Sequence, residues 1–162
     1  MFSTLFLVRM LSIYTLVNSK CSYIHKGNGN TVSNLIITGN SVGISIYQGS
    51  NNNIVSGNVI ESNSGYGINL YASNDNKIFN NNIKNNKIGI YAYTSKTNSI
   101  YSNNLIDNKD QAYDSTGLNS WDFDKMGNYW SDYNLRFRVL RATDFKIFEK
   151  THAALINIKN FE

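Results

Sequence analysis

A repeat of 22 to 24 residues runs through the middle of the chain. The starts of its four units lie 22, 24 and 22 residues apart, at Asn30, Asn52, Asn76 and Asn98. A fixed period in this range is typical of solenoid proteins, in which each unit forms one coil and stacks on its neighbours. The repeat therefore predicts a solenoid.

Two positions of the unit carry only aliphatic residues. The third position is held by Val32, Ile54, Ile78 and Ile100. The eighth position is held by Ile37, Val59, Ile83 and Leu105. Further along each unit, an apolar segment alternates with period two, which is typical of a strand with one buried face, at Gly43–Tyr47, Gly67–Tyr71 and Gly89–Tyr93. We therefore expect three short strands per unit and an all-β fold, a parallel β-helix of about four coils.

Asparagine is frequent between these strands. It tolerates left-handed backbone angles and hydrogen-bonds to its own chain, which suits the corners of a coil. Asn58, Asn82 and Asn104 share one position, and we expect them to form an internal amide ladder that begins one coil after Ile36. A disordered, prion-like tract is the alternative for such a composition, but the aliphatic columns favour a folded solenoid.

The segments outside the repeats leave some alternatives open. Residues 1–20 are mostly apolar and are interrupted by Arg9, and residues 1–27 indicate either a signal peptide or an N-terminal cap with an incomplete leading coil. Cys21 is the single cysteine, so no disulfide is expected within the chain. The rest divides into the repeats, an aromatic C-terminal cap that holds both tryptophans, and a basic tail of uncertain structure, at residues 28–114, 115–134 and 135–162.

Two motifs follow the repeats, Asn119-Ser120-Trp121-Asp122 and then GNYWSDY at residues 127–133. Together with the repeats, they resemble the NosD-type β-helix family, also called periplasmic copper-binding proteins. The resemblance covers about residues 28–134 and implies a right-handed parallel β-helix and export from the cytoplasm. It also implies either copper delivery to nitrous oxide reductase or an association with carbohydrate. The chain departs from the family in its small number of coils and in its sequence after Asn134.

Catalytic and metal-binding residues are not predicted. A glycan-cleaving β-helix needs convergent carboxylates, but Glu61 and Asp75 stand alone in the coils. The other carboxylates lie where the repeat breaks down and suit turns, at Asp107, Asp110, Asp114, Asp122 and Asp124. Copper prefers imidazole, thiolate and thioether ligands, which are scattered singly at His25, His152, Cys21, Met1, Met10 and Met126. The coils also lack the carboxylate-rich oxygen sets that calcium needs, and we predict no cofactor.

The charge distribution argues against nucleic-acid binding, and the length of the apolar N-terminal stretch argues against a transmembrane segment. The net charge of +4 arises mainly after Asn134, and nucleic-acid binding would need a basic face with aromatic residues on the coils. The apolar N-terminal stretch is too short and broken to span a membrane. We therefore expect neither nucleic acid nor a transmembrane segment.

One surface feature suggests a ligand. Tyr47, Tyr71 and Tyr93 hold the same outward position on successive coils, and Tyr91 lies beside them. Such a row either docks sugar rings or stiffens the sheet by stacking on itself, and the same two interpretations apply to a second row at Phe79 and Tyr101. We predict a non-catalytic periplasmic or cell-surface module, carbohydrate-associated or structural. An accessory protein for copper-enzyme maturation is the alternative, and a polysaccharide lyase or hydrolase comes third.

Overall fold

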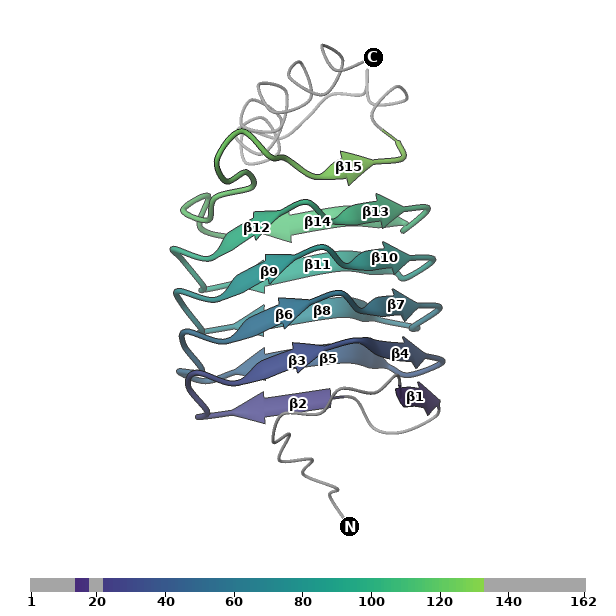
Figure 1. Ribbon diagram of the computed structural model, residues 1–162, viewed down its shortest axis with the longest axis horizontal. Helices are drawn as coiled ribbons and strands as arrows, with labels where there is room; N and C mark the ends of the chain where they lie inside the picture. Colours follow the sequence, from purple (N-terminus) through teal and green to yellow (C-terminus); the bar gives the residue numbers. More distant parts are fainter. Residues whose placement is uncertain (1–13, 18–21, 133–162) are drawn as a thin grey trace.

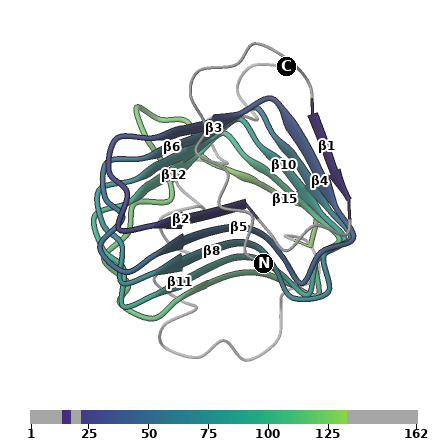
Figure 2. The same cartoon turned by 90° about the horizontal axis from the view of Figure 1, so that it is seen from below.

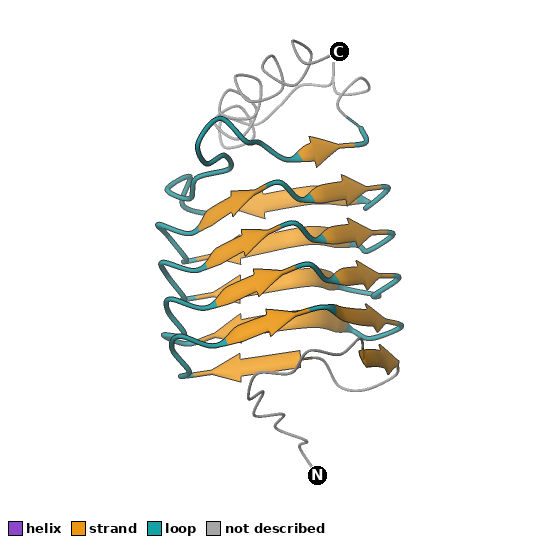
Figure 3. Cartoon of the chain, in the orientation of Figure 1, coloured by secondary structure: helices purple, strands orange, loops and turns teal. Residues whose placement is uncertain are grey.

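The chain winds into a stack of parallel β coils. The computed structural model describes residues 14–17 and 22–132, and within them it contains fifteen strands and no helix (Figure 1). The strands belong to three sheets, and all the pairings between them are parallel. Loops occupy the corners between strands in every coil (Figure 3). The predicted parallel β-helix is therefore confirmed.

The three sheets form the three sides of the coil when the stack is viewed along its axis (Figure 2). The six-stranded sheet has the order β1 (Tyr14–Val17), β4 (Leu35–Thr38), β7 (Val59–Glu61), β10 (Asn82–Lys84), β13 (Asn104–Ile106), β15 (Tyr129–Trp130). The five-stranded sheet has the order β14 (Asp110–Asp114), β11 (Ile88–Tyr93), β8 (Tyr66–Tyr71), β5 (Val42–Tyr47), β2 (Ser22–His25). The four-stranded sheet has the order β12 (Ser99–Tyr101), β9 (Lys77–Phe79), β6 (Ile54–Ser56), β3 (Thr31–Ser33).

The aliphatic columns form the core, but one residue of each predicted column is wrong. Val55, not Ile54, pairs with Val32 and Ile78, and it is fully buried. Ile60, not Val59, likewise pairs with Ile37 and Ile83. The second unit begins at Asn53 rather than Asn52, and a one-residue shift in a strand exchanges the buried face for the exposed one.

Three ladders of buried asparagine side chains run along the corners. The ladder between the four-stranded and the six-stranded sheet joins Asn58, Asn81, Asn103 and Asn128. At each rung, the backbone N and the Nδ2 of one asparagine both donate to the Oδ1 of the next, as from Asn81 to Asn103 at 3.0 and 2.9 Å. The predicted ladder through Asn82 and Asn104 is therefore wrong, because both residues lie on the outward face of their strands, in the column of Ile36 and Val59.

A glycine column sets the close packing of the coils. A Cβ atom added to Gly67 would lie 2.6 Å from the carbonyl oxygen of Gly89 on the next strand. The equivalent position in β14 is Gln111, whose Nε2 donates to the Oγ of Ser131 at 3.0 Å. Among the described residues at this position, β5, β8 and β11 carry glycine and β14 carries a side chain.

The solenoid has about five turns rather than the four expected, because its columns continue into the tryptophan-rich segment. Ser120 forms a parallel bridge with Ser99, so Trp121 follows Ile100 in the inward column. Trp130 pairs with Leu105 in β13. The exposed fractions of the Trp121 and Trp130 side chains are 1% and 9%. The tryptophan rings of residues 115–134, which we expected to form a cap, thus continue the core columns.

At the other end, β1 pairs in parallel with β4, and β2 pairs with β5. This places Tyr14–Val17 and Ser22–His25 in an incomplete leading coil. Arg9, Cys21 and the tail at residues 135–162 lie outside the described residues.

Candidate functional site: a face of stacked tyrosines

Two rows of tyrosine rings cover the outward side of the five-stranded sheet. We call this surface the tyrosine face, and it consists of Tyr47, Tyr66, Tyr71, Tyr91, Tyr93 and Tyr113. The period of two places Tyr47, Tyr71 and Tyr93 outside, because the residue before each of them is fully buried, at Ile46, Leu70 and Ala92. All four tyrosines singled out from the sequence lie on this face.

The first row follows the parallel register from β5 to β11. The ring centroids of Tyr47 and Tyr71 are 4.6 Å apart, and those of Tyr71 and Tyr93 are 5.7 Å apart, with near-parallel planes in both pairs. His25 lies at the end of the row, 6.0 Å from Tyr47, and its Nε2 lies 2.9 Å from the Oε1 of Gln48. The row thus extends over four successive strands, from β2 to β11.

The second row lies beside the first. Tyr91 stacks on Tyr66 at 4.6 Å on one side and on Tyr113 at 5.0 Å on the other. Tyr91 and Tyr93 lie 6.1 Å apart with an angle of 4° between their planes, so the two rows touch. Burial raises the pKa of the Tyr91 phenol, and the neighbouring phenols of Tyr66 and Tyr113 raise it further.

The stacking determines which parts of the rings a ligand can reach. The inner rings, such as Tyr71, present their faces to each other and their edges and hydroxyl groups to solvent. Tyr93 and Tyr113 are the most exposed, at 39% and 40%. Because β14 is the last strand of this sheet in the described part of the chain, Tyr113 is the last ring of its row there.

The tyrosine face is also free of charge over its central strands. The sequences of β5, β8 and β11 are VGISIY, YGINLY and IGIYAY, and none of them contains a charged residue. Asn69 and Ser45 add polar groups between the rings and lie 3.4 Å apart, Nδ2 to Oγ. The surface therefore offers aromatic edges, hydroxyls and amides.

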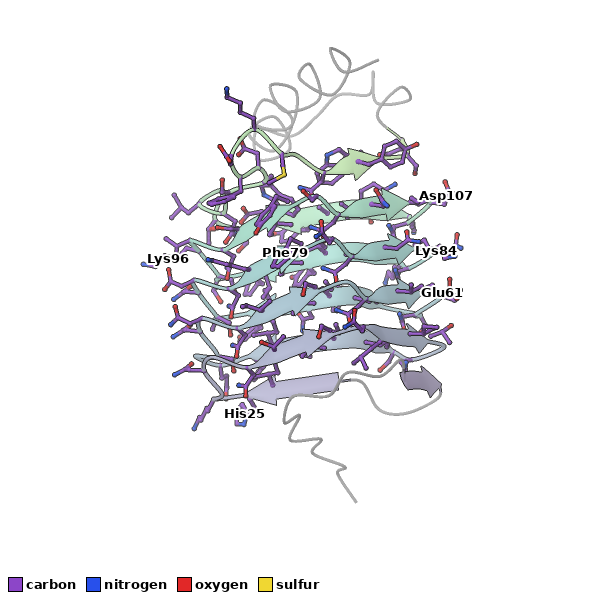
Figure 4. All side chains as sticks on the ribbon, viewed as in Figure 1. His25, Glu61, Phe79, Lys84, Lys96 and Asp107 are labelled. Carbon is purple, nitrogen blue, oxygen red and sulfur yellow. The ribbon has the colours of Figure 1, made fainter. Side chains whose placement is uncertain are left out.

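A second aromatic row lies on the four-stranded sheet. Phe79 stacks on Tyr101 at 5.2 Å, and Tyr101 packs against Phe123 at 5.1 Å. Ser56 precedes Phe79 in this column. Figure 4 shows Phe79 near the middle of the stack, with Lys96 at one side of the view and Glu61, Lys84 and Asp107 at the other. This row has one phenol, against six in the tyrosine face.

Several carboxylates hold structural contacts. Glu61 forms an ion pair with Lys84 at 2.8 Å. Asp114 is 2% exposed and its Oδ1 accepts hydrogen bonds from the backbone N of Thr116 and of Gly117, both at 3.0 Å. The Oδ1 of Asp107 accepts from the Oγ of Ser131 at 3.3 Å. These contacts suit turns and corners rather than a pair of convergent catalytic acids.

The described residues do not fit a copper site. Within residues 14–17 and 22–132, no group of three or more His, Cys, Asp and Glu side chains could hold a metal ion. His25 lies in β2 of the leading coil (Figure 4), whereas Met126 forms a bridge with Phe123 in the segment after Trp121, in the last turn. The other ligand candidates lie outside the described residues, at Met1, Met10, Cys21 and His152.

Comparison with protein families decides the relationship that the motifs suggested. The family described as "Periplasmic copper-binding protein (NosD)" matches residues 14–135, which is most of the chain. The chain belongs to this NosD family. The match spans all of the described coils, together with the GNYWSDY motif. The comparisons with curated proteins and with solved structures gave no match. In this NosD chain, the described residues contain no helix that is long and apolar enough to cross a membrane.

Sequence reasoning missed two rings of the tyrosine face in this NosD chain. Tyr66 lies at the start of β8 and does not share the repeat position of Tyr91, whose partner in register is Asn69. The Tyr66 ring nevertheless stacks on Tyr91. Tyr113 lies in the segment where the Gly-Ile pattern ends, yet Tyr91 and Tyr113 pair in register. Tyr113 follows Tyr91 by 22 residues, so one more period of the repeat would have predicted its place on this face.

Proposed function

We propose that this chain is a non-catalytic, extracytoplasmic β-helix module that holds a neutral polysaccharide against its tyrosine face. One observation carries the proposal: six phenol rings lie in two touching rows, and five of them lie on three strands without a charged residue. The location follows the periplasmic description of the family.

The geometry favours two kinds of sugar contact. The exposed sides of Tyr93 and Tyr113 offer an aromatic surface for the apolar side of a sugar ring. Along the inner rings, the phenol hydroxyls can donate to and accept from sugar hydroxyls. Coils of a parallel stack repeat at about 4.8 Å, so a glycan chain lying along the axis would meet a phenol at every coil.

The charge pattern supports a neutral ligand over an acidic one. An acidic glycan needs cationic partners near its carboxylates, and the lysines of the described coils lie at corners or on the other sheets, as Lys84 and Lys96 do (Figure 4). With a net charge of +4, the protein will still attract polyanions weakly, and salt will screen that attraction.

The test is electrophoresis of the folded protein through native gels that contain either a neutral galactomannan or polygalacturonate. We expect the neutral polysaccharide to retard the wild-type protein at low and high salt. The double variant Tyr93→Ala/Tyr113→Ala should lose most of that retardation. Tyr101→Ala is the matched control, because it removes a similarly stacked ring from a different sheet.

Three outcomes would overturn the proposal. The wild-type protein would run unretarded through a panel of neutral glycans, or the double variant would be retarded as strongly as the wild type. Retardation by polygalacturonate alone, which persists at high salt, would instead assign the surface to acidic glycans.

A role as an accessory protein in copper-enzyme maturation is the second candidate, and the family match favours it. On this account, copper would be held by residues outside the described ranges, at Met1, Met10, Cys21 and His152, because the described residues do not fit a copper site. Equilibrium dialysis against Cu(I) and Cu(II) followed by metal analysis separates the two accounts. Stoichiometric copper that survives dialysis would favour the maturation role.

A further inference from the structure

Tyr91 and Tyr113 are placed for a covalent reaction with each other. They pair in register on β11 and β14, their ring centroids are 5.0 Å apart, and their planes differ by 12°. Tyr113 is 40% exposed, so a reagent in solution can reach it. Rotation about the side-chain bonds of two such neighbouring rings brings their ortho carbons together without a change in the backbone register.

We propose that Tyr91 and Tyr113 form a dityrosine cross-link when a haem peroxidase and hydrogen peroxide oxidise the protein. Each phenol loses one electron and one proton and becomes a phenoxyl radical. A carbon–carbon bond forms between the ortho carbons of the two rings, and each ring regains its aromaticity when the ortho hydrogen moves to the oxygen. The two hydrogen atoms removed in total reduce one hydrogen peroxide to two water molecules.

The phenols that touch Tyr91 favour coupling between Tyr91 and Tyr113 over coupling between tyrosines that meet at random. Tyr66 and Tyr93 both contact Tyr91, so a radical formed on any of these rings can move to Tyr91 by electron exchange between touching rings. Tyr101 provides the contrast within the same molecule, because its ring neighbours are Phe79 and Phe123, which cannot couple in this way.

The cross-link would fasten two successive coils together. Tyr91 and Tyr113 lie in neighbouring turns, so the new bond closes a loop of the chain and reduces the freedom of the unfolded state, as a disulfide does. The expected consequence is a higher melting temperature after oxidation. The bond would hold β14, the last described strand of its sheet, to the coil before it.

Tryptic peptides make the product easy to identify. Cleavage after lysine places Tyr91 in residues 88–96, Tyr101 in residues 97–109 and Tyr113 in residues 110–125. After treatment of the full chain with peroxidase and peroxide, we expect a species with the summed mass of residues 88–96 and 110–125 less two hydrogen atoms. Fragmentation should locate the bond at Tyr91 and Tyr113, and the digest should show dityrosine fluorescence.

The matched variant is Tyr113→Phe, which keeps the ring stack and removes the phenol. It should lose this peptide and the rise in melting temperature, while the unoxidised variant melts close to the unoxidised wild type. A mixture of nitrogen-15-labelled and unlabelled protein distinguishes bonds within one chain from bonds between chains. Bonds found mainly between chains, or at Tyr101 as often as at Tyr113, would overturn the proposal.

Discussion

Asn128 accepts two hydrogen bonds from Asn103, from the backbone N at 3.0 Å and from Nδ2 at 2.9 Å. This contact continues the ladder of Asn58 and Asn81 into the GNYWSDY motif, across a loop that lengthens the last interval to 25 residues. The family motif is therefore a rung of the ladder followed by a core residue, Trp130. The function of the motif in the fold is to continue the columns of the repeat with larger side chains.

The ladder predicts that substitutions of the adjacent residues Asn81 and Asn82 differ greatly in their effect on the free energy of unfolding. Asn81→Ala removes the acceptor of the Asn58 backbone N and the donor to the Val55 carbonyl. Each buried group left without a partner costs about 1–3 kcal/mol, so urea unfolding should show a loss of at least about 2 kcal/mol. Asn82→Ala lies on the outward side and should stay within about 0.5 kcal/mol of wild type.

Equal losses in the two variants would contradict the register described here. A larger loss for Asn82→Ala would restore the ladder that the sequence alone suggested.

Trp130→Ala should destabilise the solenoid from its last turn. The ring is 9% exposed and packs against Trp121 at 5.6 Å, and truncation of a buried Trp typically costs about 3–5 kcal/mol. Loss of the ring should also bare strand edges and promote association, which light scattering detects. The control is Tyr129→Ala, whose ring is 52% exposed. An unchanged melting temperature for Trp130→Ala would remove this residue from the core.

Much of the fold follows from the sequence, because the period and the aliphatic columns repeat. The fold class, the three strands per coil and the register of Gly43–Tyr47 with Gly67–Tyr71 were all predicted from these patterns. The inward positions of the second coil were not. The sequence of residues 51–55, NNNIV, fits the repeat in two frames, and only the contacts of Asn53 with its neighbours in adjacent coils decide between them.

The tyrosine face was partly visible in the sequence. Tyr47, Tyr71 and Tyr93 share a column, so their alignment follows from the repeat alone. The sequence could not show that the rings stack face to face, which depends on side-chain rotation. That stacking places the proposed sugar contacts at Tyr93 and Tyr113, the most exposed rings of the face.

Alkaline pH should destabilise the protein partly through Tyr91. Its pKa is raised in the folded state by burial and by neighbouring phenols. Above the ordinary phenol pKa of about 10, the unfolded chain therefore loses a proton that the folded chain still holds. The contribution of Tyr91 to the free energy of unfolding is then complete below that pH and falls as the pH rises through it.

The variant Tyr91→Phe checks this directly. Its stability, measured by urea unfolding from neutral pH to about pH 11, should fall less steeply above pH 10 than that of wild type. Parallel curves for the two proteins across this range would contradict the raised pKa.

The central claim is that the tyrosine face binds a neutral glycan through its outermost rings, and calorimetric titration with a neutral oligosaccharide tests it most directly. The account predicts that Tyr113→Ala weakens binding with a small change in melting temperature. Tyr71→Ala should instead lower the melting temperature more, because it removes two ring contacts that each contribute about 0.5–1.5 kcal/mol. Undiminished affinity in Tyr113→Ala, for an oligosaccharide that the wild-type protein binds, would contradict the account.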